Sequence, residues 1–298
     1  MAALNIDYNE IAKRLPKKQY NFRESWYVYK SNKPALVAAF VVVFLFAAAF
    51  IGPLFFPYET ALKQTIRDML TSPNSKYWFG TDNLGRDIFA RIINGARISL
   101  TLGFIPTIIG MFFGMLFGAC AAYFGKLVDN IIMRVCDILT CIPGILLMLL
   151  FVTVLGYGFE NLLIAITAAS IPSYTRYVRS LILSIVENDY VEAARSCGTG
   201  SIAIMYKHVL RNAIGPLLLL GTSNISEMIM MGAGLSFLGL GVQPPTPEWG
   251  LMLANARDFM RSAPYMLFIP GIAILLSVLS FNLVGDGLRD VLDPRLRR

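Results

Sequence analysis

Long apolar segments separated by shorter polar ones dominate this chain. A membrane-crossing helix needs about 20 predominantly apolar residues to cover about 30 Å of hydrocarbon. Six segments meet that length or approach it: Ala35–Phe56, Ile98–Phe124, Ile138–Tyr157, Leu162–Val178, a segment beginning near Ala213, and Tyr265–Gly285. The pattern therefore predicts an all-α integral membrane protein with six transmembrane helices.

Glycines recur at intervals of about four residues, or multiples of it, along the second predicted span. Residues spaced in this way lie close to one stripe of a helix, where the missing side chains let another helix backbone approach closely. We interpret the stripe as a packing surface rather than as part of a pore. Its members are Gly103, Gly110, Gly114 and Gly118.

The stretch "RDIFARIINGARISL", residues 86–100, is amphipathic if it is helical. Its isoleucines and phenylalanine fall on one side and its arginines largely elsewhere, a pattern typical of a helix that lies in the membrane interface. We expect such an interfacial helix immediately before the second span.

A second polar stretch, "DYVEAARSCGTGSIAIMYKHVLRNA" at residues 189–213, interrupts the apolar pattern. Asp189 followed by Glu192 is similar to a capping box, and Gly198 is suited to end a helix. Ser201 is suited to begin a second one. The residues predict helix, turn, helix. The first helix is either a knob with small side chains that fits a groove in another protein, or a connector lying on the membrane surface.

Composition and charge agree with a membrane protein and indicate its orientation. Hydrophobic residues make up 56% of the 298 residues and charged residues only 15%. Cytoplasmic loops carry an excess of Lys and Arg. With both termini inside, 18 of the 26 Lys and Arg residues fall on the cytoplasmic side, counting Arg176 with the loop that follows it. The net charge of +7 then reflects topology and lipid contact rather than a nucleic-acid partner.

The sequence offers little chemistry of its own. It has no G-x-x-x-x-G-K-[ST] phosphate-binding loop, one histidine, and four cysteines without metal-site spacing. We therefore predict no catalytic residue, no metal site and no cofactor in this chain. Glu227 is the one acid deep in an apolar span, where a charge is costly unless it faces protein or water. It either faces a translocation path or pairs with a neighbouring subunit or a hydroxyl such as Ser223.

Several blocks resemble the dipeptide, oligopeptide and nickel permease family of ABC importers, specifically its C-type subunit. "YVEAARSCG…HVLRNA" is similar to the EAA loop of ABC-importer permeases. Three further blocks resemble this subunit, and the likeness covers the chain from about residue 25 to its end: "FGTDNLGRDIFARIINGARISL" at 79–100, "LSFLGLGVQPPTPEWGLML" at 235–253, and "FNLVGDGLRDVLDPRLR" at 281–297.

The resemblance implies a type I ABC-importer permease architecture in a prokaryotic cell (inner) membrane. Expected partners are a second homologous permease subunit, two cytosolic ATPase subunits that hold ATP and Mg, and an extracytoplasmic binding protein. The EAA helix would couple the permease to an ATPase through Glu192, Ala193, Ala194 and Gly198. Asp82, Arg86 and Asp87 are candidate polar contacts for the binding protein.

Two positions depart from the family pattern. Arg211 stands where a proline is usual, so the second helix of the loop is expected to continue into the fifth span with less of a kink. Gly232 stands where many relatives carry an acid, so no function is transferred to it.

The expected organisation divides the chain at its membrane boundaries. A cytosolic N-terminal segment (1–34) precedes the first span (35–56) and an extracytoplasmic loop with the interfacial helix (57–97). A five-helix permease core (98–287) contains the cytosolic coupling loop (184–212), and a cytosolic tail (288–298) follows.

The expected function is ATP-driven import of di- or oligopeptides. Alternatives are the same architecture importing nickel or another metal chelate, an ion-coupled secondary transporter, and an intramembrane enzyme. The chain has one buried acid and no convincing internal repeat, which argues against the last two classes.

Overall fold

The computed structural model describes Trp26 and residues 29–292, so most of the predicted N-terminal segment and residues 293–298 lie outside the described part. Within that part every regular element is helical, apart from one isolated bridge between Thr81 and Asp87. The long helices are α3 (Lys33–Phe50), α6 (Ile88–Phe124), α7 (Lys126–Thr140), α8 (Gly144–Leu155), α9 (Phe159–Val186), α12 (Arg211–Phe237) and α14 (Tyr265–Leu292). The short ones are α4 (Gly52–Phe55), α5 (Tyr58–Leu62), α10 (Asp189–Ser196), α11 (Ser201–Ile204) and α13 (Trp249–Ala256).

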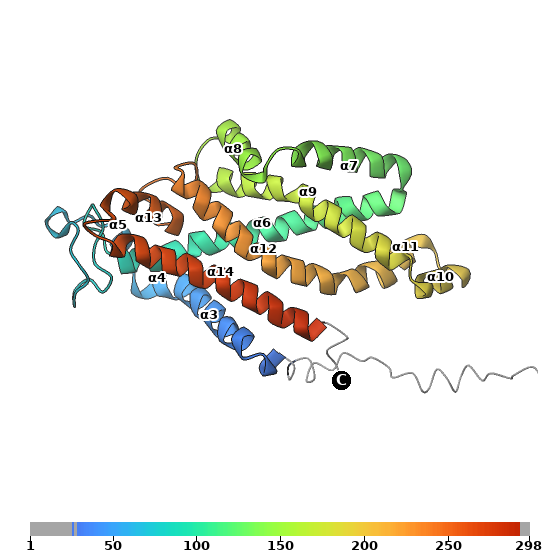
Figure 1. Cartoon of the computed structure of the whole chain (residues 1–298), viewed down its shortest axis with the longest axis horizontal. Coiled ribbons are helices and arrows are strands. Elements are labelled where there is room, and N and C mark those ends of the chain that lie inside the picture. The colour runs from blue at the N-terminus through green and yellow to red at the C-terminus, as the bar shows by residue number, and fades with distance from the viewer. Residues whose placement is uncertain (1–25, 27–28, 293–298) are drawn as a thin grey trace, which may run out of the picture.

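Apart from α8, the long helices run roughly along one axis, and most connecting segments gather at its two ends (Figure 1). Residues 57–87 and 238–264, with α5 and α13, form one end, which we call the loop end. The helices α10 and α11 project at the opposite end, which we call the α10 end. The start of α3 and the end of α14 point toward the α10 end, and Asn32 Nδ2 donates a hydrogen bond to Asp290 Oδ2 at 2.8 Å.

Four of the described helices are long and apolar enough to cross a membrane, and the bent pair α7 and α8 makes a fifth candidate. The four are α3, α6, the continuous helix from Met205 through α12, and α14. The remaining predicted span corresponds to α9, which has 28 residues but does not reach the same apolarity. It carries Arg176 and Arg179, which pair with Asp137 and Asp129 of α7. The count of six spans stays a prediction.

The third predicted span, residues 138–157, is wrong as a single helix. Helix α7 ends at Thr140, α8 begins at Gly144, and the two axes meet at 90°. Pro143 lies between them in an extended conformation. A proline lacks the backbone N–H needed to continue the helix and disfavours helical geometry at the residue before it. The chain therefore turns here.

The predicted interfacial helix is not a separate element. Residues 88–97 are the first turns of α6, which continues without a break to Phe124 over 37 residues. Arg91 and Ile93 of this stretch are both buried by protein, and its place at the membrane interface stays a prediction.

The glycine stripe of α6 packs against two helices, as its spacing predicted. A Cβ built on Gly118 would lie 2.8 Å from the Thr175 carbonyl oxygen of α9, and one on Gly110 would lie 2.6 Å from Ser170 Oγ. Gly114 faces Tyr174, and Gly103 faces α12 at Ile229. Only glycine leaves room for these approaches, and α9 is consequently enclosed by α6, α7, α8 and α12.

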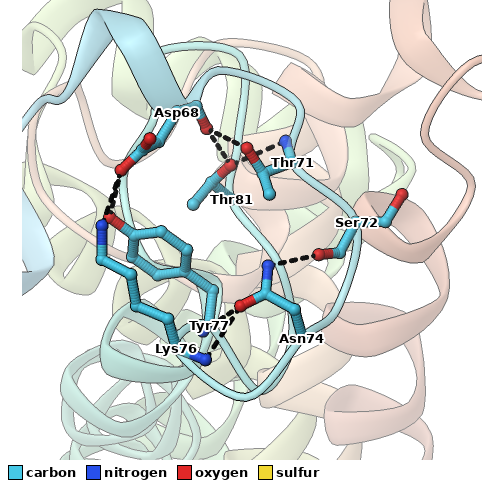
Figure 2. Close-up of polar contacts among 7 residues, drawn as sticks. All are labelled: Asp68, Thr71, Ser72, Asn74, Lys76, Tyr77 and Thr81. Carbon is cyan, nitrogen blue, oxygen red and sulfur yellow. Dashed lines mark hydrogen bonds and ion pairs between the residues drawn. The ribbon is translucent and has the colours of Figure 1, made fainter.

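A compact polar cluster closes the loop between residues 68 and 81 (Figure 2). The Asp68 carboxylate accepts hydrogen bonds from Tyr77 Oη at 2.7 Å and Lys76 Nζ at 2.9 Å. Across the loop, Thr81 Oγ1 accepts from the Thr71 backbone N–H at 2.9 Å. Tyr265 Oη of α14 also reaches the Thr71 and Thr81 carbonyl oxygens, at 3.1 Å each, so the loop is fixed to the bundle.

The α6–α9 packing predicts a selective effect of one added methyl group. In Gly118→Ala the new Cβ meets α9 backbone and must push the helices apart, so we expect a loss of about 1–3 kcal/mol of stability. Gly234→Ala in α12 is the matched control, because no atom lies within 4 Å of its added Cβ. Thermal unfolding of the purified protein in detergent measures both variants. Equal melting temperatures for the two would contradict the close approach.

The Asp68 cluster predicts a defined pH response. Hydrogen bonds from Tyr77 and Lys76 lower the pKa of Asp68 below its ordinary value. The resulting stabilisation is therefore complete above the unfolded-state pKa and is lost only as pH falls through the lower folded-state pKa. At pH 7 we expect Asp68→Asn to speed hydrogen exchange in residues 71–81. Asp258→Asn, at another exposed acid of the loop end, should leave that exchange unchanged.

Candidate functional site

The most accessible candidate site is α10, at the end of the bundle opposite the loop end (Figure 1). Asn188 occupies its N-cap position, so the helix begins at Asp189, one residue earlier than the capping-box interpretation of Asp189 required. The Asn188 side chain donates instead to the Ser184 and Ile185 carbonyl oxygens of α9. The side chain of Val191 is fully buried in a cluster with Val178, Ile182 and Val209. This cluster holds α10 against α9 and the helix that follows.

The C-terminal end of α10 confirms that Gly198 stops the helix. Gly198 has a φ of +82°, a conformation that glycine adopts without strain. The Thr199 N–H donates to the Ala194 carbonyl oxygen at 3.1 Å, and the Gly198 N–H donates to the Arg195 carbonyl oxygen at 3.0 Å. These two bonds form a Schellman motif, which satisfies carbonyl groups that the helix end would otherwise leave unpaired.

The face of α10 that points away from the bundle carries the motif side chains. Glu192 and Ala193 are exposed, Ala194 is half-buried, and Gly198 is exposed. No hydrogen bond or ion pair of the Glu192 side chain occurs among the described residues. The helix therefore offers a small, rigid projection with one carboxylate, a shape suited to insertion into a groove.

The second helix of this loop continues into α12, as the presence of Arg211 in place of proline predicted. A π-helical turn, Met205–Leu210, joins α11 to α12, and Met205–Phe237 forms one helix of 33 residues. Arg211 has helical dihedral angles, φ −61° and ψ −38°. The connection between the α10 end and the membrane is thus a single helical rod.

Glu227 lies on α12 and is exposed on the surface of the isolated chain. Neither a hydrogen bond nor an ion pair to its carboxylate is present in the described part, and Ser223 makes no such bond to it. Tyr174 of α9 lies close enough for electrostatic interaction with it. The Tyr174 side chain is buried, and its hydroxyl lies near Thr107 and Asn224 without forming a hydrogen bond of good geometry. An acid without an ion-pair partner in the described part thus lies near the buried Tyr174 hydroxyl, after a short run of polar residues at 222–224 of α12.

The three polar residues suggested for partner contact at the loop end have structural partners of their own. Asp82 and Arg86 are only 6% and 3% exposed and pair at 2.6 Å. Asp87 is the N-cap of α6 and accepts from the Phe89 N–H at 2.9 Å, while burial raises the pKa of its carboxyl. Asp82 and Arg86 present almost no surface to a partner, so any role in docking would act through the shape of the loop.

Two buried residues that sequence reasoning did not single out connect the loop end. Arg91 Nη1 donates one hydrogen bond to the Ala61 carbonyl oxygen at 3.2 Å and one to the Pro245 carbonyl oxygen at 3.3 Å. The Arg91 side chain therefore joins α5 to the loop that follows α12. Glu248 is fully buried and accepts from the backbone N–H groups of Gly250 and Leu251 at the start of α13. Glu248 is the N-cap of α13, but glutamate is not among the usual N-cap residues, so neither its role nor the partners of Arg91 could be predicted from the sequence.

Among the described residues no group of three or more His, Cys, Asp and Glu side chains lies close enough to hold a metal ion. The four cysteines are free thiols.

Comparison with known proteins identifies the family. Residues 110–298 match the family described as the binding-protein-dependent transport system inner membrane component. Residues 21–73 match the N-terminal TM domain of oligopeptide transport permease C.

Three relatives align over nearly their whole length. The chain is 41% identical over 276 residues to the glutathione transport system permease protein GsiD of Pectobacterium atrosepticum, covering 93% of this chain and 92% of that protein. It is 39% identical over 286 residues to the dipeptide transport system permease protein DppC of Alkalihalophilus pseudofirmus, covering 95% and 94%. It is 41% identical over 282 residues to the di/tripeptide transport system permease protein DppC of Pseudomonas aeruginosa, covering 92% of each.

A solved structure supports the fold. One chain of the inward-facing MetNI methionine ABC transporter superposes with a TM-score of 0.56 at 18% identity, covering 69% of this chain and 98% of that one. This likeness shows the fold, and the sequence matches identify the chain as a C-type permease of the binding-protein-dependent transport system inner membrane component family.

Proposed function

We propose that this chain forms half of the membrane passage of an ATP-driven importer of short peptides. The exposed, rigidly held α10 carries the proposal, because it is a ready-made contact for a cytosolic ATPase. The cargo is inferred from the relatives, which are named as transporters of glutathione, dipeptides and di- or tripeptides. These names favour peptides over metal chelates.

The α10 end faces the cytoplasm in this proposal, and the loop end faces outward. The distribution of Lys and Arg supports this orientation, since 18 of 26 fall in the segments that the sequence assigns to the cytoplasmic side. Both termini are then cytoplasmic, and the protein belongs in a prokaryotic inner membrane.

The working assembly contains this chain, a second homologous permease, two ATPase subunits and an extracytoplasmic binding protein. ATP and Mg are held by the ATPases, and this chain performs no covalent chemistry. The Glu192 and Ala193 surface of α10 enters a groove of one ATPase, with Ala194 and Gly198 shaping the contact.

Coupling proceeds by leverage. When ATP closes the two ATPases, α10 is displaced, and its buried anchor at Val191 transfers that displacement to α9 and to the rod that ends in α12. Because Met205–Phe237 has no break, a movement at the α10 end tilts the rod as one body. The passage between the two permeases changes its open side as a result.

Glu227 faces the passage in this proposal and meets the amino terminus of the peptide. A carboxylate exposed toward lipid at this depth would be strongly unfavourable, so a partner or water must cover the face that carries it. Pairing with the second permease is the alternative, and it predicts a loss of assembly rather than a loss of substrate affinity.

The binding protein docks on the loop end. Exposed apolar side chains there include Ile66 and Met69 beside the Asp68 cluster, as well as Trp78 and Met260. Arg91 and Tyr265 fix the surrounding loops to the bundle, so the docking surface is rigid. Asp82, Arg86 and Asp87 support it from beneath.

The proposal as a whole is tested by gentle solubilisation and affinity purification of the tagged chain. We expect a second permease and two ATPases to co-purify, and peptides of two to five residues with the binding protein to stimulate ATP hydrolysis. Recovery of this chain alone would overturn the assembly, whereas stimulation only by a metal chelate would change the cargo.

The coupling role of α10 predicts two uncoupled variants. Gly198→Val forces a β-branched residue into a φ of +82°, at a cost of about 1–3 kcal/mol, and so distorts the helix end. Glu192→Lys reverses the exposed charge. Both should insert normally yet lose most peptide-stimulated ATPase activity and uptake. Gly200→Val is the control, since Gly200 has neither a positive φ nor an atom within 4 Å of an added Cβ.

The passage role of Glu227 predicts a change in substrate affinity. Removing the charge in Glu227→Gln should raise the transport KM for peptides about ten-fold, since a charged hydrogen bond contributes about 1.5 kcal/mol or more. Peptides with an acetylated amino terminus should show no such difference. Glu160→Gln, at an exposed acid at the start of α9, is the control. Unchanged KM for free peptides would refute the contact.

A further inference from the structure

An apolar slot runs between the C-terminal part of α6 and the π-helical turn that precedes α12. It has a volume of about 250 Å³. The α6 side contributes Leu116, Ala119, Cys120, Tyr123 and Phe124, and the turn contributes Met205, Tyr206 and Leu210. No charged side chain lines the slot, so it is suited to a hydrocarbon chain.

The slot adjoins a wider mouth at the α10 end, which carries a few polar groups. A wider hollow of about 660 Å³ shares Tyr123 and Tyr206 with the slot and adds Lys207, Ser201 and small residues. Lys126, three residues after Tyr123 at the start of α7, is exposed close to the same helix end. Neither lysine has an ion-pair partner among the described residues. The mouth therefore combines uncompensated positive charge with two tyrosines.

The surface of α6 beside the slot continues its apolar character toward the middle of the bundle. Phe113 and Phe117 are 37% and 40% exposed, and Phe112 is 58% exposed. Such a surface is compatible with lipid tails, while aromatic and basic groups at its end match the headgroup region of a bilayer. An anionic lipid requires an apolar surface for its acyl chains and positive charge for its headgroup. The slot supplies the first and its mouth supplies the second.

We propose that the slot binds one acyl chain of an anionic phospholipid, whose phosphate lies against Lys207 with Lys126 nearby. The proposal rests on the orientation given above, which puts the slot in the cytoplasmic leaflet. The lipid lies directly against the π-helical turn, so it supports the junction between the coupling loop and α12. It acts as a structural ligand of the loop that meets the ATPase.

Native mass spectrometry of the assembled, delipidated transporter tests this site by adding back phosphatidylglycerol or phosphatidylcholine. We expect phosphatidylglycerol to be retained preferentially. Lys207→Gln should weaken its retention about five-fold, since each basic residue near an anionic surface contributes about 1 kcal/mol. Lys63→Gln, at an exposed lysine of the loop end, is the charge-matched control and should have no effect.

A second pair of variants addresses the slot itself. Leu116→Trp fills the slot from its exposed rim without disturbing buried packing, and it should reduce phosphatidylglycerol retention to the level of phosphatidylcholine. Ile108→Trp, at an exposed position on the same helix, should not. A photocrosslinking residue at position 116 should label lipid.

The outcomes separate the lipid site from the proposed function. Equal retention of both lipids, or no effect of Lys207→Gln and Leu116→Trp, would overturn the lipid site. Crosslinks from position 116 to the second permease or to an ATPase would overturn it as well. Failure of the importer proposal would instead appear as absent peptide-stimulated ATP hydrolysis, which these lipid measurements do not use.

Discussion

In a bilayer an apolar side chain gains little by leaving lipid for another helix, so helices associate through close contact of their backbones and side chains. In this chain that constraint falls on α6 and α9. The glycines of α6 let α9 approach until backbone meets backbone at Thr175. The rest of the bundle is arranged around that contact. Helices α7 and α8 cover α9 on its other sides, and α12 crosses both α6 and α9.

The two ends of the bundle are held by different kinds of contact. At the loop end, the buried Arg91 joins loops that are distant in sequence, and the buried Glu248 accepts a hydrogen bond from Ser99 of α6. At the α10 end, one buried apolar side chain and one helix-end motif hold a short helix outward. Hydrogen bonds connect the loops of the first end into one surface, while at the second end α10 projects beside the continuous helix that includes α12. This contrast suits a protein that receives a partner on one side and is moved by a partner on the other.

Features determined by neighbouring residues could be predicted from the sequence. The glycine stripe, the stop at Gly198 and the unbroken helix through Arg211 each depend on a few consecutive turns. The bend at Pro143 could not be predicted, because prolines are tolerated within other long helices of this chain, at Pro106, Pro172, Pro216 and Pro270. Burial of Asp82 and Arg86 also depends on segments far away in the sequence, so these side chains looked available for a partner.

The polarity of α9 has a consequence for how the protein is made. A helix with two arginines and several hydroxyl groups partitions poorly into lipid when it emerges alone from the translocation machinery. Its close partner α6 precedes it in the chain and is strongly apolar, and α7 brings the acids that pair with its arginines. Because α6 and α7 precede α9 in the chain, both are synthesised before it. During synthesis, α9 can therefore enter the bilayer in contact with these two helices.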